Sequence, residues 1–409
     1  MKYLLKAREI YTPEKILSNT GVLVEDGSIT EVGINSKAEV KMINIQDYKL
    51  LPGLIDMHIH GVVGFDVMEA SYHSLNEISK YLSRNGVTSF VATTVTARLE
   101  RIENAVSSVA EVMRKGLDGA RVLGSYVEGP YIAKEYKGAH PEEWIRDIDL
   151  EEIGGLIQKS NNTIRVMTIA PEKKKCSEAI EFLTGKGVKV SMGHTGAAYH
   201  KAITAVECGA SIAVHLFNGM RGLHHRDAGM LGAALNDDRV NVELICDGVH
   251  VDIPAMQIAV RCKRMENMLL ISDCTMAGGL PDGEYMLGEM KVNVKGRIAR
   301  VADGSLAGST LRLIDAVRNM VEKVGVPFED AVKMASLNPA RTLGLDKSLG
   351  SIERGKKADL IAIDDRYNVV FTMIGGEIKY CNENMGQSEN VKYLWEKFKW
   401  GGENDKTEF

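Results

Sequence analysis

The sequence predicts an α/β protein built on a (β/α)8 TIM-like barrel, with a small β-sandwich domain formed by the N- and C-terminal segments. Three observations support this prediction. From residue 54 onwards, short apolar runs alternate with amphipathic helical stretches, which favours a parallel sheet. Eight such runs occur before residue 275, and eight repeats favour closure into a barrel. The first 50 residues and the segment after Gly350 show strand patterns instead, so we expect them to form a separate domain.

Both ends of the chain carry these short strand patterns. Gly21–Glu25 and Ile29–Val32 flank Asp26-Gly27, a dipeptide that favours a two-residue hairpin turn. Near the other end, the predicted strands are Ala358–Ile363, Val369–Met373 and Glu377–Tyr380. We therefore expect a small β domain of residues 1–50 and 350–385, a catalytic barrel of residues 51–349 and a C-terminal helical tail of residues 386–409. The apolar face of that tail would pack on its own domain or on a second subunit.

The barrel region contains eight candidate strands separated by helical patterns. The strands are predicted at Leu54–His60, Ser89–Thr94, Arg121–Glu128, Thr163–Ile169, Val188–His194, Ser211–His215, Asn241–Cys246 and Met268–Asp273. The helices include Leu75–Asn85, Leu99–Lys115, Ser177–Thr184, His200–Cys208, Ile253–Lys263, Leu311–Val324 and Phe328–Ser336. A hairpin-like insert is expected at Gly283–Arg300.

The first barrel strand ends in two histidines separated by one residue, His58 and His60. Side chains two residues apart on a strand share one face, so both imidazoles project together. Two converging imidazoles suit a divalent metal ion. The alternative is a pair of histidines hydrogen-bonded inside the core.

Polar residues recur where the other barrel strands end. In a barrel of this kind, the active groups lie at the C-terminal ends of the strands. Each residue alone could be a helix cap or a satisfied core residue, but caps have no reason to gather on one rim. Together they predict a metal site. The residues at or just after strand ends are His58, His60, Glu128, His194, His215, His250 and Asp273.

These residue types fit metal-assisted hydrolysis. Neutral imidazoles and a carboxylate hold a divalent ion and leave a position for water. Bound water then loses its proton near neutral pH. A further carboxylate can take up that proton and pass it to a leaving amine. Asp273, on the last strand, is the predicted general base and acid.

Composition narrows the possible partners. The net charge of −5 argues against nucleic acid or an anionic membrane as the main partner. No apolar run is long enough to span a bilayer, and the N-terminal segment does not resemble a signal peptide. The six cysteines are scattered and without CxxC spacing, as is typical of reduced thiols. We expect a cytoplasmic enzyme that acts on a small molecule.

Several motifs, taken together and in order, resemble the amidohydrolase superfamily and more narrowly the N-acetylglucosamine-6-phosphate deacetylase family. The resemblance covers nearly the whole chain. The motifs are the HxH of the first strand, Tyr126-Val127-Glu128-Gly129-Pro130-Tyr131, Gly193-His194-Thr195, His215-Leu216-Phe217-Asn218-Gly219-Met220, Asp247-Gly248-Val249-His250, Ser272-Asp273 and the closing segment Leu337-Asn338-Pro339-Ala340-Arg341.

The resemblance implies metal ligands. Glu128, His194 and His215 would bind the principal ion, zinc or iron. His58 and His60 match a pair that some members use for a second ion. Many amidohydrolases bridge two ions with a carboxylated lysine on the fourth strand, but the fourth strand predicted here has no lysine. Glu128 could bridge instead, so one or two ions remain possible.

The resemblance also implies a sugar-phosphate site and a homodimer that shares it. The implied sugar contacts are Ala139 and His140, the phosphate contacts Asn218, Gly219, Arg226 and His250, with Asp247 beside them, and the acetyl-side contacts Leu306, Ala307 and Gly308. An arginine offers phosphate a forked set of donors. The alternative for Arg226 is a surface ion pair with a neighbour such as Asp227.

The expected reaction is hydrolysis of N-acetylglucosamine 6-phosphate to glucosamine 6-phosphate and acetate. The sequence leaves open N-acetylgalactosamine 6-phosphate as the substrate. It also leaves open another amidohydrolase activity, on a cyclic amide or as a deaminase. A rival of a different class is a non-catalytic barrel, against which the complete ligand set argues.

Overall fold

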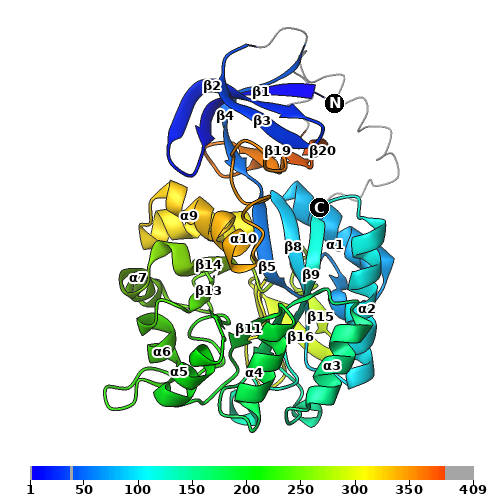
Figure 1. Ribbon diagram of the computed structural model, residues 1–409, viewed down its shortest axis with the longest axis vertical. Helices are drawn as coiled ribbons and strands as arrows, with labels where there is room; N and C mark the ends of the chain where they lie inside the picture. Colours follow the sequence, from blue (N-terminus) through cyan, green and yellow to red (C-terminus); the bar gives the residue numbers. More distant parts are fainter. Residues whose placement is uncertain (1, 37–39, 383–409) are drawn as a thin grey trace.

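The computed structural model describes residues 2–36 and 40–382, and it contains two main sheets. In Figure 1 the sheet formed by both ends of the chain lies at the top and the barrel lies below it. The expected α/β barrel and the sheet that joins the N- and C-terminal strands are both confirmed. The predicted helical tail, residues 386–409, lies outside the described residues, and the boundaries proposed for the domains remain a prediction.

The barrel is an eight-stranded parallel sheet that nearly closes. Its first strand, β5 (Leu54–Ile59), meets its last, β14 (Met268–Ile271), where the Asp273 backbone N–H donates to His58 O at 2.9 Å. At the same seam the buried Asp56 carboxylate accepts the Ser272 backbone N–H at 3.2 Å. In sheet order, the strands are β5 (Leu54–Ile59), β8 (Val87–Thr94), β9 (Arg121–Val127), β10 (Ile164–Ile169), β11 (Lys189–Met192), β12 (Ile212–Ala213), β13 (Asn241–Ile245) and β14 (Met268–Ile271).

Helices cover the outside of the barrel, and an apolar face turned to the strands explains most of them. In α2 the buried residues, among them Ile102, Val106 and Val109, follow helical spacing. The α-helices are α1 (Tyr72–Arg84), α2 (Leu99–Lys115), α3 (Leu150–Lys159), α4 (Cys176–Gly185), α5 (Tyr199–Glu207), α6 (Gly229–Asn236), α7 (Ile253–Cys262), α8 (Leu313–Asn319), α9 (Phe328–Met334) and α10 (Leu337–Thr342). The short helical turns are η1 (Val67–Glu69), η2 (Lys134–Tyr136), η3 (Glu142–Trp144), η4 (Met265–Asn267) and η5 (Met320–Val324), and η5 continues α8.

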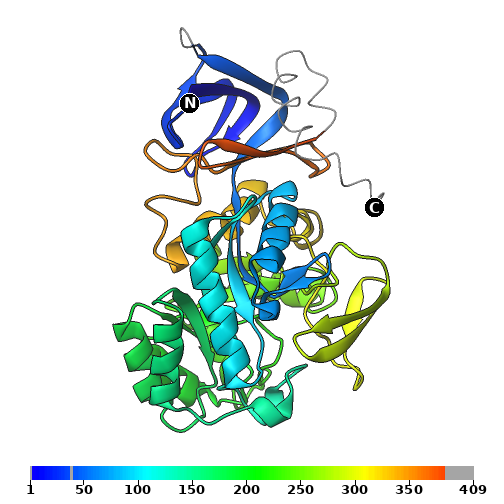
Figure 2. The same cartoon turned by 90° about the vertical axis from the view of Figure 1, so that its right-hand side faces the viewer.

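The second sheet has seven strands and its own apolar core. The expected hairpin turn is present, since Asp26 and Gly27 have φ of 47° and 81°. Figure 2 shows the C-terminal strands (orange to red) beneath the N-terminal ones (blue), with the core between them. In sheet order, the strands are β20 (Glu377–Cys381), β19 (Val369–Ile374), β18 (Leu360–Ile363), β4 (Lys41–Pro52), β1 (Lys2–Tyr11), β2 (Ile16–Glu25) and β3 (Ser28–Ile34).

The insert after β14 projects from one side of the barrel (yellow in Figure 2). It forms three antiparallel strands rather than the single expected hairpin: β15 (Gly283–Leu287), β16 (Met290–Lys295) and β17 (Ile298–Arg300). Its side chains have a small apolar core that includes Leu287 and Ala307. The strands β6 (Gly61–Val62) and β7 (Phe65–Asp66) form a two-stranded ribbon. The buried carboxylate of Asp66, the last residue of β7, accepts the Gly288 N–H at 3.0 Å and so ties the insert to the barrel.

The second sheet, which is formed by both ends of the chain, lies at the N-terminal end of the barrel strands. Arg121, the first residue of β9, pairs with Asp359 at 2.7 Å, and Gly53, just before β5, donates its N–H to Asp359 O. The C-terminal ends of the same strands therefore remain free for a site at the opposite end of the barrel.

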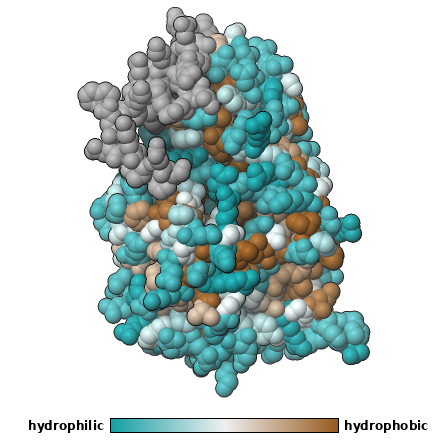
Figure 3. Space-filling view, turned by 180° about the vertical axis from the view of Figure 1, so that it is seen from behind, coloured by the Kyte–Doolittle hydropathy of each residue, from teal (hydrophilic) through white to brown (hydrophobic). Residues whose placement is uncertain are grey.

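The surface mixes polar and apolar residues. On the face seen in Figure 3, apolar residues gather over the middle of the molecule among hydrophilic ones. The exposed large apolar side chains include Leu223, Val249 and Ile258. Within residues 2–36 and 40–382, no helix combines the length and the apolar character needed to cross a membrane.

Candidate active site

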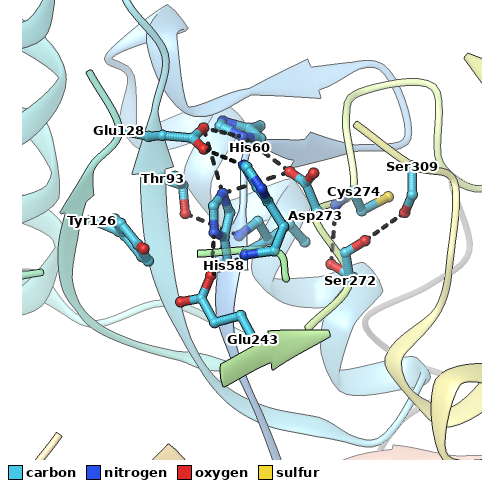
Figure 4. Close-up of polar contacts among 12 residues, drawn as sticks. His58, His60, Thr93, Tyr126, Glu128, Glu243, Ser272, Asp273, Cys274 and Ser309 are labelled. Atoms are coloured by element: carbon cyan, nitrogen blue, oxygen red, sulfur yellow. Dashed lines mark hydrogen bonds and ion pairs between the residues drawn. The ribbon is translucent and has the colours of Figure 1, made fainter. Parts of the chain in front are cut away.

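Two groups of three buried side chains lie side by side at the C-terminal rim of the barrel. We call Glu128, His194 and His215 the first triad, and His58, His60 and Asp273 the second triad. Within each triad, one ligand atom of every residue lies within 4.8 Å of the others. Strands that are far apart in the sequence thus bring six predicted residues together, as Figure 4 shows for the second triad and Glu128.

Glu128 stands between the triads. Its Oε1 lies 3.2 Å from His194 Nε2 and 3.0 Å from His215 Nε2. Its Oε2 lies 3.2 Å from His60 Nε2 and 3.5 Å from His58 Nε2. Each carboxylate oxygen therefore faces a different triad, which is the geometry required of a bridging ligand.

Asp273 completes the second triad. Its Oδ1 lies 3.2 Å from His60 Nε2 and 3.6 Å from His58 Nε2. The residue predicted as the general base is therefore also placed to be a ligand. This double position is the main feature of the site that the sequence did not predict.

Several of these residues lie just beyond the strands, in left-handed backbone conformations. The strands β11, β12 and β14 each end two residues before His194, His215 and Asp273, whose φ angles are 45°, 26° and 49°. Non-glycine residues adopt such angles rarely, and they cluster at functional sites. The local turn redirects each side chain across the rim. Gly193 permits the turn at His194, because a Cβ there would lie 1.7 Å from Val214 Cγ1.

The histidines are oriented through their Nδ1 atoms. His194 Nδ1 donates to Tyr136 O at 2.9 Å, and His215 Nδ1 donates to Asn218 O at 3.1 Å. His58 Nδ1 instead faces a buried carboxylate, Glu243 Oε2, at 3.0 Å. A hydrogen bond at Nδ1 fixes the tautomer and leaves Nε2 free to bind a metal.

His140 has the opposite tautomer. The Thr96 N–H donates to His140 Nδ1 at 3.2 Å, and Thr96 Oγ1 lies 2.7 Å from the same atom. A nitrogen that accepts a backbone N–H carries no proton, so the neutral ring holds its hydrogen on Nε2. Burial and the neighbouring His194 lower the pKa of His140 to about 4, so the ring is neutral at pH 7. His140 therefore presents an N–H donor 3.6 Å from Glu128 Oε2.

The carboxylates of the site are ionised at neutral pH. Burial raises the pKa of Glu128, but His58 and the hydrogen bonds from the other histidines hold it well below its usual range. Burial likewise raises the pKa of Asp273, yet His60 and His58 bring it down to about 2. For His60, burial lowers the pKa but Asp273 and Glu128 raise it to about 9. Without an ion, a proton on His60 thus balances part of the negative charge.

The two triads fit divalent metal ions. They offer four imidazoles and two carboxylates, which are ligands of zinc, iron and similar ions. His58 Nε2 is buried and has no hydrogen-bond partner among the described residues, although it faces both Glu128 and Asp273. A buried nitrogen without a partner is costly, and an ion at this position would supply one.

The predicted substrate residues are placed at different distances from this centre. Gly219 packs against the first triad, since a Cβ there would lie 2.9 Å from His194 Nδ1. Gly308 lies beside Asp273, where a Cβ would come within 3.6 Å of its Oδ1. The remaining predicted residues are Ala139 and His140 after η2, Asn218 after His215, Asp247 with His250, and Leu306 and Ala307 after β17.

The predicted phosphate residues differ in burial. Asp247 accepts from His250 Nδ1 at 2.7 Å and so orients that ring. Arg226 is exposed, and its guanidinium contacts His225 Nε2 at 2.8 Å. Asp227, the neighbour considered as an ion-pair partner of Arg226, pairs with Arg221 instead. The structure thus places Arg226 on a surface loop and does not bring it to the triads.

Sequence reasoning missed Glu243 and Thr96. Glu243 is an acidic residue with apolar neighbours on both sides in strand β13, and this contrast could have singled it out. Thr96 follows β8 by two residues, but a threonine at a strand end is too common to be a signal.

Comparison with known protein families matches residues 50–379 to the amidohydrolase family. The chain belongs to this family. Its relatives also include an N-acetylglucosamine-6-phosphate deacetylase of Vibrio furnissii, 42% identical over 87% of this chain and 89% of the relative. An N-acetylgalactosamine-6-phosphate deacetylase of Escherichia coli O157:H7 is equally similar, at 42% identity over 92% of this chain and 99% of the relative.

A solved structure supports the same assignment. A mutant N-acetyl-D-glucosamine-6-phosphate deacetylase from Mycobacterium smegmatis, in complex with N-acetyl-D-glucosamine-6-phosphate, superposes with a TM-score of 0.87 and 33% identity. The match covers 92% of this chain and 99% of that structure. The resemblance to the N-acetylglucosamine-6-phosphate deacetylase family inferred from the motifs is confirmed.

Proposed function

We propose that this amidohydrolase removes the acetyl group from N-acetylglucosamine 6-phosphate, giving glucosamine 6-phosphate and acetate. The observation that carries the proposal is the pair of buried triads joined by Glu128 at the rim of the barrel. The relatives named for this reaction, and the sugar phosphate bound in the similar structure, supply the substrate class.

The chain's own residues suit the steps of amide hydrolysis. A divalent ion held by a triad lowers the pKa of water and polarises a carbonyl. Asp273, ionised at neutral pH, accepts a proton from the attacking water. His140 donates its Nε2–H to the acetamide oxygen as negative charge develops there. Asp273 then returns the proton to the amide nitrogen as the C–N bond breaks, releasing acetate and the amino sugar.

The phosphate would be held away from the triads. We assign this role to His250, Asn218, Gly219 and Arg226, with Asp247 orienting His250. Because Arg226 lies on an exposed loop, its contribution requires the loop to approach the substrate or a second subunit to complete the site. We propose a homodimer, and the exposed Leu223 and Val249 near this loop and site are consistent with a contact there.

A second candidate substrate is N-acetylgalactosamine 6-phosphate. The specific observation in its favour is the Escherichia coli relative. It is as similar to this chain as the Vibrio relative is, at 42% identity, and the match covers 99% of its length. The two sugars differ only in the configuration of one hydroxyl, so both would present the same acetamide and phosphate groups to the residues above.

The test is acetate release from both sugar phosphates and from their unphosphorylated forms, with zinc or iron supplied. We expect kcat/KM to favour N-acetylglucosamine 6-phosphate, and phosphorylation to raise it strongly. Preference for the galactosamine compound would assign the second substrate. Equal rates without phosphate would contradict the phosphate contacts, and the absence of acetate from every sugar would favour another amidohydrolase reaction, such as cyclic-amide hydrolysis. A cytoplasmic location remains part of the proposal.

A further inference from the structure

Glu243 is a buried carboxylate with no role in the reaction described above. It is the third residue of β13 and is fully buried. Its Oε2 lies 3.0 Å from His58 Nδ1 and accepts the His215 backbone N–H at 3.4 Å. One carboxylate oxygen therefore touches a residue of each triad. Figure 4 shows His58 between Glu128 and Glu243.

The environment of Glu243 is unfavourable for a charge. Its side chain shares one face of β13 with that of Ile245, a buried residue of an apolar cluster. Its second oxygen, Oε1, has no hydrogen-bond partner among the described residues. An ionised carboxylate in such surroundings is costly unless a positive charge compensates it. Positive charge near Glu243 would offset this cost, and the second triad lies on the far side of the His58 ring.

The number of carboxylates in the site bears on how many divalent ions it can hold. Histidines bind metal as neutral imidazoles and acidic residues as carboxylates. Counted in that form, Glu128, Asp273 and Glu243 contribute three formal negative charges to the site. One divalent ion leaves one negative charge uncompensated. Two ions leave one positive charge in excess, whereas without Glu243 they would leave two. The third carboxylate therefore lowers the electrostatic cost of binding a second ion.

The second triad also depends on Glu243 for its geometry. His60 Nδ1 has no hydrogen-bond partner among the described residues, so no such bond fixes that ring. Among the described residues, the hydrogen-bond partner of His58 Nδ1 is Glu243. By contrast, backbone carbonyls orient both histidines of the first triad.

We propose that Glu243 is a positioning residue that points His58 Nε2 into the second triad and supplies the negative charge that allows a second divalent ion to bind there. The inference deepens the proposed metal-dependent function and rests on it. Mutation of a carboxylate that holds a metal-binding histidine typically lowers metal affinity by about 10–100-fold.

The experiment compares Glu243→Gln and Glu243→Leu with the unaltered chain. Each protein is stripped of metal and given Zn²⁺ alone in graded amounts against a competing chelator, and bound zinc per chain is measured by elemental analysis. Glutamine keeps the shape and the acceptor but removes the charge, whereas leucine removes both. Asp315→Asn is the matched control, because it neutralises a buried carboxylate on α8 that pairs with Arg312 and Arg318 away from the site.

We expect the unaltered chain and Asp315→Asn to bind two ions. Glu243→Gln should keep the first ion at unchanged affinity and bind the second about 10–100-fold more weakly, and Glu243→Leu should bind one. Two ions at unchanged affinity in Glu243→Gln would overturn the inference. An unaltered chain that binds a single ion would also overturn it, yet would leave the deacetylase proposal standing. If the unaltered chain bound two ions and Glu243→Gln lost the second, but no sugar phosphate gave acetate, the deacetylase proposal would fall and the role of Glu243 would stand. Thermal unfolding of the metal-free Gln variant checks that it folds.

Discussion

The two triads use similar residues but are supported in different ways. In the first triad, His194 and His215 lie on tight turns after their strands, and backbone carbonyls hold their Nδ1 atoms. In the second, His58 belongs to a strand and relies on the side chain of Glu243. Orientation set by backbone survives most side-chain changes, whereas orientation set by one carboxylate does not. The second triad should therefore be the easier one to lose.

The largest effect is expected from Glu128→Gln, which breaks the link between the triads. An amide has one oxygen, so it can serve only one of the two groups that Glu128 now faces. Metal content should fall, and turnover should fall beyond the roughly 10⁴-fold that loss of a general base can cost. Elemental analysis and acetate release measure both. Glu152→Gln, on α3 and paired with Arg146, is the matched control, and near-normal activity in Glu128→Gln would refute the bridging role.

Asp273→Asn separates proton transfer from ion binding. Asparagine cannot accept the water proton, so kcat should fall by about 10²–10⁴-fold. The first triad does not contain Asp273, so at least one ion should remain bound. Metal analysis of the same preparation checks this. Wild-type turnover would defeat the general-base assignment, and complete loss of metal would show that the triads do not bind independently.

Replacing His140 tests a residue that lies beside both triads. His140→Phe removes the Nε2–H donor and should lower kcat by about 10²–10³-fold, the typical loss of one donor to a developing oxyanion. Metal content should not change, because its Nε2 carries a proton and is not a ligand. Thr96→Val is the finer variant: it deletes the hydroxyl but keeps the backbone N–H that sets the tautomer, so a much smaller loss is expected. Equal losses in the two variants would contradict the tautomer argument.

Much of this arrangement could be predicted from sequence because it is encoded locally. Apolar runs between helical patterns located all eight barrel strands. His58 is the penultimate residue of β5, Glu128 directly follows β9 and Asp273 follows β14 by two residues. The helices α3, α6 and α10 were not predicted. Helix α3 contains the pair Gly154-Gly155, every residue of α6 but the last is buried and shows no polar face, and α10 contains Pro339.

Local sequence patterns could not predict the contacts between segments that are far apart in the chain. Glu243 and His58 are 185 residues apart, and Thr96 and His140 are 44 apart. Their pairing depends on the register of the closed barrel, which no local pattern specifies. The backbone carbonyls that orient His194 and His215 are equally invisible, because every residue has one. The sequence therefore predicted the candidate ligands but not the groups that hold them.

The smallest expected effect is a loss of folding stability at high pH in the metal-free protein, caused by the second triad. The pKa of His60 is raised to about 9 in the metal-free fold, against roughly 6.5 for an unfolded histidine. A raised pKa contributes stability that is complete below pH 6.5 and is lost as the pH rises through 9. At about 1.4 kcal/mol for each pKa unit, the loss is on the order of 3 kcal/mol. His58, whose pKa is also raised, acts in the same direction.

Urea unfolding of chelator-treated protein at pH 6.5 and 9 measures this loss. His60→Asn should show a smaller decrease between the two pH values, because only His58 of the pair still titrates. Added Zn²⁺ should stabilise the unaltered chain more at the higher pH, since an ion must displace the proton that His60 carries at the lower one. A metal-free chain that is equally stable at both pH values would show that Glu128 and Asp273 do not hold a proton on His60, and the charge balance inferred for the second triad would then be wrong.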